Sequence, residues 1–196
     1  MKFYITPDDP EVKAAVKDIL GQQLRVLNDF EALRDWAFWY VSYRYDQDVH
    51  GVPDYWQLPA ETIELRTGDC EDFAILLCSL LRAYGVPADQ VYAAVGVSED
   101  RAYHGYLMEK WYKGIWRVIE PQAGVWTGMF FEDWATSVTY KELYCFNDQD
   151  YLKGPPTLPP GVYEFGITCF LCGALGLGFC LGGGQTITAS VEWLGK

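Results

Sequence analysis

Hydrophobic residues in the N-terminal part of the chain recur every three or four positions, the period of an amphipathic helix. Asp9 and Pro10 are residue types that favour a helix cap and a first turn, so we predict a helix over about residues 10–28. A second, aromatic-rich helix is predicted over residues 30–40. From about residue 43 a glycine and prolines interrupt the pattern and predict an irregular segment.

Residues 70–84 form the most hydrophobic predicted helix, because apolar side chains cover most of its circumference. Such a helix is expected at the centre of a domain. Gly85, followed by Pro87, marks its C-terminal end. Cys78 on this helix is interpreted as a core residue. The same interpretation is given to four aromatic residues of the preceding segment, Trp36, Trp39, Tyr40 and Tyr43.

After the central helix the hydrophobic period changes to two, which is typical of strands. We predict three strands in this part of the chain, over residues 90–97, 104–110 and 115–120. The last two would form a hairpin that turns around Lys113 and Gly114, and Tyr144–Phe146 is predicted as an edge strand. Helices followed by an antiparallel sheet predict an α+β domain over residues 1–150.

The C-terminal part of the chain has a different composition. Residues 151–164 are rich in proline and glycine, which predicts a stiff linker. Residues 165–184 then carry no charged side chain and are numerous enough to cross a bilayer as a helix. Gly178 and Gly182 have the spacing that lets membrane helices approach closely. A buried pair of glycine-rich strands is the alternative; we favour a membrane anchor, followed by a tail over residues 185–196.

The chain is strongly acidic, with 15 Lys+Arg, 27 Asp+Glu and a formal charge of -12 at pH 7. This charge argues against nucleic acid as a partner, because a polyanion would be repelled. The hydrophobic content of 50% excludes a disordered chain. The N-terminus shows no signal-peptide pattern, so we expect mostly free thiols in a reducing, cytoplasmic compartment.

The candidate chemistry is concentrated around Cys70, at the start of the central helix. Gly68 would supply the turn before this helix and Asp69 would cap it. A thiol in the first turn feels the positive end of the helix dipole, which favours the thiolate. The negative charges of Asp69, Glu71 and Asp72 oppose this effect and raise the pKa of the thiol. An active thiolate would therefore need a positive partner.

One of the two histidines can provide this partner. His104 opens one strand of the predicted hairpin and Glu120 closes the other, so antiparallel pairing would bring them together. If the sheet packs against the start of the central helix, His104 can also face Cys70. The three residues would then form a nucleophile, a base and an orienting carboxylate. His50 has no comparable partner in the sequence.

Three blocks of the sequence resemble the transglutaminase-like superfamily, and most closely its branch of bacterial transglutaminase-like cysteine proteinases. The blocks occur in the order of that family, at residues 54–87, 104–106 and 116–121. Together they extend the resemblance over roughly residues 36–121, which is more than a third of the chain.

The resemblance implies a papain-like core, with Cys70 as the nucleophile and His104 as the general base. Glu120 stands where the family usually has aspartate, which keeps an acidic partner but makes its side chain one methylene longer. An oxyanion hole would combine the Cys70 backbone amide with a donor upstream, for which Trp56 and Gln57 are candidates.

The resemblance also raises the question of a metal. In related periplasmic proteases of this branch, acidic residues next to the cysteine bind calcium, which would implicate Asp69 and Glu71. A bound cation would also reduce the repulsion at the thiol. Helix capping is the simpler role for these carboxylates and is the one we favour, so no cofactor is required and calcium is an option. Cys169 and Cys172 are a weak redox or zinc motif, because no second pair accompanies them.

These features favour an enzyme that breaks amide bonds of a protein or peptide through a thioester on Cys70. Water as the acceptor gives a cysteine protease or amidase, which is the first hypothesis. An amine as the acceptor gives a protein-crosslinking transglutaminase, and the sequence does not choose between the two acceptors. A non-catalytic binding or scaffold domain that keeps the fold is a further possibility.

Overall fold

The computed structural model describes residues 1–22, 28–98, 103–110, 116–122, 132–133 and 140–154. The chain divides into two compact units, Met1–Pro156 and Thr157–Lys196, and every described residue belongs to the first. The predicted membrane anchor and tail therefore lie outside the described residues. Within the described part of the chain, the helices are too short or too polar to cross a membrane.

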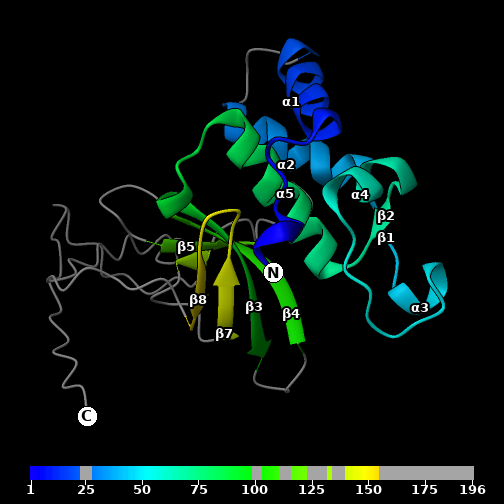
Figure 1. Ribbon diagram of the computed structural model, residues 1–196, viewed down its shortest axis with the longest axis vertical. Coiled ribbons are helices and arrows are strands. Elements are labelled where there is room, and N and C mark those ends of the chain that lie inside the picture. Colours follow the sequence, from blue (N-terminus) through cyan, green and yellow to red (C-terminus); the bar gives the residue numbers. More distant parts are fainter. Residues whose placement is uncertain (23–27, 99–102, 111–115, 123–131, 134–139, 155–196) are drawn as a thin grey trace, which may run out of the picture. The chain divides into compact units, whose positions relative to one another are not determined.

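Most of the helices precede the main sheet along the chain (Figure 1). The α-helices are α1 (Pro10–Gln22), α2 (Asp29–Tyr40), α3 (Asp46–Val49), α4 (Pro59–Leu65) and α5 (Cys70–Tyr84). Short 3-10 helices are η1 (Lys2–Tyr4) and η2 (Ala88–Gln90). The strands are β1 (Ser42–Tyr43), β2 (Thr67–Gly68), β3 (Val91–Ser98), β4 (Tyr103–Lys110), β5 (Trp116–Ile119), β6 (Glu132–Asp133), β7 (Tyr140–Phe146) and β8 (Tyr151–Lys153).

The main sheet is antiparallel and has the strand order β6-β5-β4-β3-β7-β8. Helix α5 packs on its central strands β3 and β4, and α1 and α2 pack in turn on α5 (Figure 1). The short strands β1 and β2 form a separate parallel pair just before α5. Helices packed on an antiparallel sheet confirm the predicted α+β fold.

The first two helices form where the sequence predicts them, because their first turns are capped. The Asp9 carboxylate accepts a hydrogen bond from the Glu11 amide at 2.8 Å, and Asn28 Oδ1 accepts one from the Glu31 amide at 2.9 Å. Each helix buries one apolar face against α5, with Leu33 fully buried on α2. Residues 23–27, at the predicted end of the first helix, lie outside the described residues.

The segment predicted to be irregular contains two short helices, α3 and α4. Pro59 begins α4 as its first helical residue, a position where the missing backbone N–H costs nothing. The same proline had been interpreted only as an interruption, so the prediction was wrong at this point. These helices are too short for a hydrophobic period to reveal them.

Two of the aromatic residues predicted to be core are exposed. Trp39 is 65% exposed and Tyr43 is 45% exposed. The buried stripe of α2 is formed by smaller residues, so the α2 face that carries Trp39 has no partner layer among the described residues. Trp36 and Tyr40 stack on each other with ring centroids 4.2 Å apart and pack partly against the core.

Helix α5 is the central buried helix that the sequence predicts. Its residues from Phe73 to Leu81 are almost completely buried, and Cys78 lies among them as expected. Gly85 ends the helix with φ 113°, a left-handed conformation that glycine adopts without a steric cost. The two long strands that follow, β3 and β4, lie within one residue of their predicted bounds.

The prediction of an edge strand over Tyr144–Phe146 was wrong, because β7 pairs with β3 on one side and β8 on the other. Strand β8 consists of Tyr151–Lys153, the first residues of the segment that composition describes as a linker. The backbone of β8 thus covers the hydrogen-bonding edge of β7.

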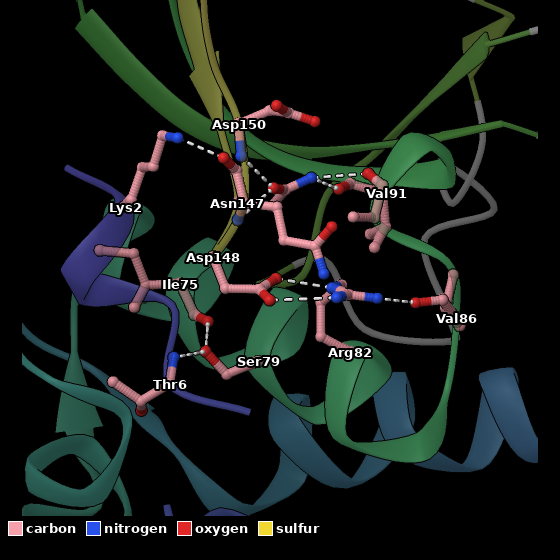
Figure 2. A network of polar contacts seen from close by, with 12 residues as sticks. Lys2, Thr6, Ile75, Ser79, Arg82, Val86, Val91, Asn147, Asp148 and Asp150 are labelled. Atoms are coloured by element: carbon pink, nitrogen blue, oxygen red, sulfur yellow. Dashed lines mark hydrogen bonds and ion pairs between the residues drawn. The ribbon is translucent and has the colours of Figure 1, made fainter. Parts of the chain in front are cut away.

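A polar network fixes α5 to the turn between β7 and β8 (Figure 2). Arg82 on α5 makes two contacts with the Asp148 carboxylate, at 2.6 and 3.0 Å. Next to it, Asn147 donates to the backbone oxygens of Ala88 and Val91 at 2.6 and 3.0 Å. Almost one turn earlier on α5, Ser79 accepts a hydrogen bond from a backbone amide of the N-terminal segment. The network ties α5 to both ends of the described chain.

Candidate active site

Cys70 is the first residue of α5, and its position depends on a tight approach by the segment before it. A Cβ atom on Gly68 would stand 2.7 Å from Cβ of Asp72, so any larger residue would displace that side chain. Asp72 is fully buried and accepts a hydrogen bond from the Asp69 amide at 3.2 Å. This bond caps the helix directly at the cysteine.

The Asp72 carboxylate also holds the loop that runs ahead of the helix. It accepts hydrogen bonds from the backbone amide of Gln57 at 2.8 Å and from its side-chain Nε2 at 2.9 Å. Burial raises the pKa of Asp72 to about 7, although these hydrogen bonds act in the opposite direction. A carboxyl group that takes up a proton more readily than an exposed aspartate therefore lies next to the cysteine turn.

Strand β4 crosses the first turn of α5 at Gly105. A Cβ atom at this position would lie 2.6 Å from Cα and 2.7 Å from the backbone nitrogen of Glu71. These neighbours are backbone atoms, so only glycine allows the strand to come this close. The packing of the sheet against the start of the helix is thus confirmed, and His104 is placed one residue from the contact.

A hydrogen bond between the Gly105 backbone amide and the Cys70 sulfur links the two elements. This bond lowers the pKa of the thiol, because a donor stabilises the thiolate. It is outweighed by burial and by the charge of Glu71, which together raise the pKa of Cys70. The thiol itself donates to Glu71 Oε2 at 3.2 Å. In this arrangement Cys70 is a protonated thiol with a carboxylate as its acceptor.

His104 and Glu120 are brought together as predicted. Strands β4 and β5 pair antiparallel, with Leu107 opposite Ile119. Continued past the strand end, this register brings Glu120 level with Tyr106, so Glu120 meets His104 diagonally across the strand pair. The distance between His104 Nε2 and Glu120 Oε2 is 2.7 Å, and both side chains are largely buried. Because Nε2 faces the carboxylate, Nε2 is the donor of this contact and Nδ1 is the opposite nitrogen of the ring.

Gln122 completes this polar group, although the sequence analysis did not select it. Its Nε2 atom lies 3.1 Å from Glu120 Oε2 and 3.0 Å from His104 Nε2. The residue follows Glu120 by two positions, across Pro121, in a turn at the end of β5. No periodic pattern marks a residue in such a turn, so the sequence gives little signal for it.

Carboxylates from three segments gather beside Cys70. Oxygen atoms of Asp46, Asp54 and Glu71 lie within 4.8 Å of one another, as do those of Asp46, Asp69 and Asp72. Burial raises the pKa of Asp69 and of Glu71, since the charged forms lose water and crowd each other. Asp69 Oδ1 is buried and has no hydrogen-bond partner among the described residues. The sequence does not indicate Asp46 and Asp54, because the short helix α3 and the loop after it are brought here only by the fold.

Both sequence candidates for an oxyanion donor are already engaged. The indole N–H of Trp56 donates to Asp54 Oδ1 at 3.1 Å, and its ring stacks on Phe146 with centroids 5.8 Å apart. The Gln57 carboxamide donates to Asp72. Their role in an oxyanion hole stays a prediction. Tyr43 is a further neighbour of this group: burial raises its pKa, and the acidic groups around it, Asp69 and Glu71 among them, add to the effect.

The fold and the site together define a class of α+β proteins. In this class a helix begins at a cysteine and packs on an antiparallel sheet that carries a histidine–carboxylate pair. Residues 13–134 match the transglutaminase-like superfamily, and the chain therefore belongs to it. No curated protein sequence matches the chain.

Solved structures share the fold. LapG of Legionella pneumophila in an EGTA-treated form is 23% identical, with a TM-score of 0.57, over 73% of this chain and 74% of that chain. A calcium-bound form of LapG is also 23% identical, with a TM-score of 0.53, over 76% of this chain and 80% of that chain.

Proposed function

We propose that the protein is a cysteine-dependent enzyme that cleaves amide bonds of a protein or peptide. Cys70 is the nucleophile, His104 the general base and Glu120 the residue that orients the imidazole. One observation carries this proposal: strand β4, which holds His104 in a 2.7 Å contact with Glu120, crosses the helix at the cysteine itself. The superfamily supports the same chemistry.

The reaction has two halves. The Cys70 sulfur attacks the carbonyl carbon of the amide while Nδ1 of His104 takes the thiol proton. The C–N bond then breaks, the proton passes to the leaving amine, and a thioester on Cys70 remains. Water, deprotonated by His104, attacks the thioester and releases the acid and the free thiol. The first turn of α5 offers the Cys70 backbone amide to the developing oxyanion.

The carboxylates beside Cys70 fit a calcium ion, because they supply hard oxygen ligands and one of them, Asp69, has a buried oxygen without a partner among the described residues. Either Asp46, Asp54 and Glu71 or Asp46, Asp69 and Asp72 would hold the ion. When bound, it would neutralise the negative charge that keeps Cys70 protonated. The calcium-bound and EGTA-treated forms of LapG make this cation the first one to test.

Transfer to an amine is the second candidate reaction. It shares the thioester with hydrolysis and differs only in the acceptor, and superfamily membership supports both. A scaffold role would need no reactive thiol, and the contacts between Gly105, Cys70 and the His104–Glu120 pair favour the enzyme over it.

The test is the alkylation rate of Cys70 by iodoacetamide in the native protein near neutral pH, measured by mass spectrometry of the cysteine peptide. We expect rapid labelling with calcium and at least about tenfold slower labelling in EGTA, because the carboxylates then keep the thiol protonated. His104→Ala should remove the rapid phase, and buried Cys78 is the internal control.

If wild-type protein and His104→Ala label Cys70 at the same rate in calcium, the enzyme proposal is refuted and the scaffold role stands. If labelling is rapid, release of peptides from casein distinguishes hydrolysis from incorporation of dansylcadaverine into the same protein. Cys70→Ser is the matched control for both assays, because it keeps the shape of the side chain without the thiolate.

A further inference from the structure

Gln122 touches both members of the His104–Glu120 pair. The Glu120 Oε2 atom receives His104 Nε2 at 2.7 Å and Gln122 Nε2 at 3.1 Å. The same amide nitrogen lies 3.0 Å from His104 Nε2, so the three polar atoms form a closed triangle. Pro121 is buried and separates Glu120 from Gln122 in the turn. Its ring fixes the backbone φ angle at this position and so restricts where the Gln122 side chain can lie.

The chemistry of the three side chains determines which atoms donate hydrogen bonds. A carboxylate oxygen only accepts, so the two nitrogens that face Glu120 Oε2 must both be donors. His104 Nε2 therefore carries a hydrogen, and the Gln122 amide donates to the carboxylate and not to the imidazole. The opposite orientation of the Gln122 amide would place its oxygen 3.1 Å from a carboxylate oxygen, where the two would repel each other.

The longer acidic side chain makes a second contact useful. Glutamate has one more rotatable bond than aspartate, so its side chain has more conformations in which the carboxylate does not contact the imidazole. A donor from Gln122 limits these alternatives by holding the same oxygen that accepts from His104. It also favours the hydrogen on Nε2, which leaves the lone pair of the neutral imidazole on Nδ1.

We propose that Gln122 is a positioning residue that holds the Glu120 carboxylate against Nε2 of His104. The proposal rests on the function proposed above and adds a fourth residue to its site. Gln122 donates to the carboxylate and not to the imidazole, so its effect is expected to pass through Glu120.

A double-mutant cycle tests this dependence, with calcium present and the alkylation rate of Cys70 as the readout. Gln122→Ala should slow alkylation about tenfold, the effect of one hydrogen bond to a charged group. In a Glu120→Gln background the same substitution should change the rate by less than about twofold, because the acceptor has already lost its negative charge. Gln149→Ala, at an exposed glutamine away from the site, is the matched control.

An exchange of the two side chains gives a second test that does not depend on the alanine variant folding. In Glu120→Gln with Gln122→Glu, a carboxylate oxygen would stand where the amide nitrogen now lies, 3.0 Å from His104 Nε2. The exchanged variant should therefore alkylate several-fold faster than Glu120→Gln alone, and its dependence of rate on pH should return toward that of the wild type.

Three results would overturn the positioning role. Gln122→Ala alkylates Cys70 as fast as the wild type, or it slows alkylation equally in the Glu120→Gln background, or the exchanged variant alkylates no faster than Glu120→Gln alone. Failure of the proposed function looks different. In that case the wild-type protein itself labels no faster than His104→Ala, and the role of Gln122 is overturned with it.

Discussion

At the scale of single residues, the candidate site depends on a glycine as much as on its polar side chains. Gly105 lets β4 approach α5 until a side chain would collide with the backbone of Glu71. The same residue gives its amide to the Cys70 sulfur. Backbone atoms cannot rotate away as a flexible side chain can, so the space at this position is fixed.

Gly105→Ala should therefore separate the strand from the helix. We expect a loss of about 1–3 kcal/mol in the free energy of unfolding, the usual cost of overpacking, together with slower alkylation of Cys70. Chemical denaturation and the labelling assay measure the two effects. Gly21→Ala is the control: a Cβ atom there meets nothing within 4 Å, and alanine should stabilise α1 by about 0.5–1 kcal/mol. Equal stability in both variants would contradict the steric account.

The sequence predicts the polar side chains of the site better than their supports. Cys70, His104 and Glu120 are visible because a helix start and two strand ends hold reactive residue types. Antiparallel pairing predicts that His104 and Glu120 lie near each other, and their side chains then make a 2.7 Å contact diagonally across the strand pair. Gln122 is not visible in the same way, because a turn has no period that would say where its side chain lies.

At the scale of elements, long and strongly periodic segments are predicted well and short ones are not. Helix α5 and strands β3 and β4 bury whole faces, so their hydrophobic patterns reveal them. Helices α3 and α4 are stabilised by their place in the fold. Asp46, for example, accepts a hydrogen bond from the Tyr55 amide at 2.5 Å and fixes the loop between these helices.

The ion pair between α5 and the β7–β8 turn can be tested at this scale. Asp148→Asn should cost about 1–3 kcal/mol in the free energy of unfolding, because Arg82 would keep its charge while its side chain is only 11% exposed. Urea denaturation measures the loss. Asp89→Asn breaks the pair with Lys110, in which Asp89 is 69% exposed, and should cost no more than about 0.5 kcal/mol. If both substitutions lower the free energy of unfolding by the same amount, the Arg82–Asp148 pair stabilises the protein no more than an exposed ion pair does.

At the scale of the whole molecule, an excess of acidic residues is combined with carboxylates that are difficult to ionise. The chain has a formal charge of -12, and part of that charge is gathered at Asp46, Asp54, Asp69, Glu71 and Asp72. The charge total was evident from composition, but the gathering was not, since it joins loops far apart along the chain. Its physical effect is a folded state that holds protons more tightly than the unfolded chain does.

This difference predicts how stability depends on pH. The pKa of Asp72 rises from 3.8 in the unfolded chain to about 7 in the folded protein, so between these values the folded state binds more protons. Stability in EGTA should then increase as the pH falls from about 7 toward about 5. Thermal melts across this range, with and without calcium, provide the measurement. Calcium should raise the melting temperature most at the higher pH, where the ligands are ionised.

Asp69→Asn should weaken both the pH dependence and the effect of calcium, because it removes one of the raised carboxyl groups. Asp8→Asn is the control, since that carboxylate is exposed and Lys13 lowers its pKa. A melting temperature that falls steadily from pH 7 to 5 in EGTA would contradict the role assigned to the buried carboxylates.

The close crossing at Gly105 also has a consequence for the order in which the protein is made. Helix α5 leaves the ribosome before β4 and β5, so a nascent chain that ends at Tyr84 carries the sulfur without the histidine, the glutamate or the amide of the crossing strand. Under the function proposed above, Cys70 therefore gains its base and its orienting carboxylate only when the later strands have docked on α5.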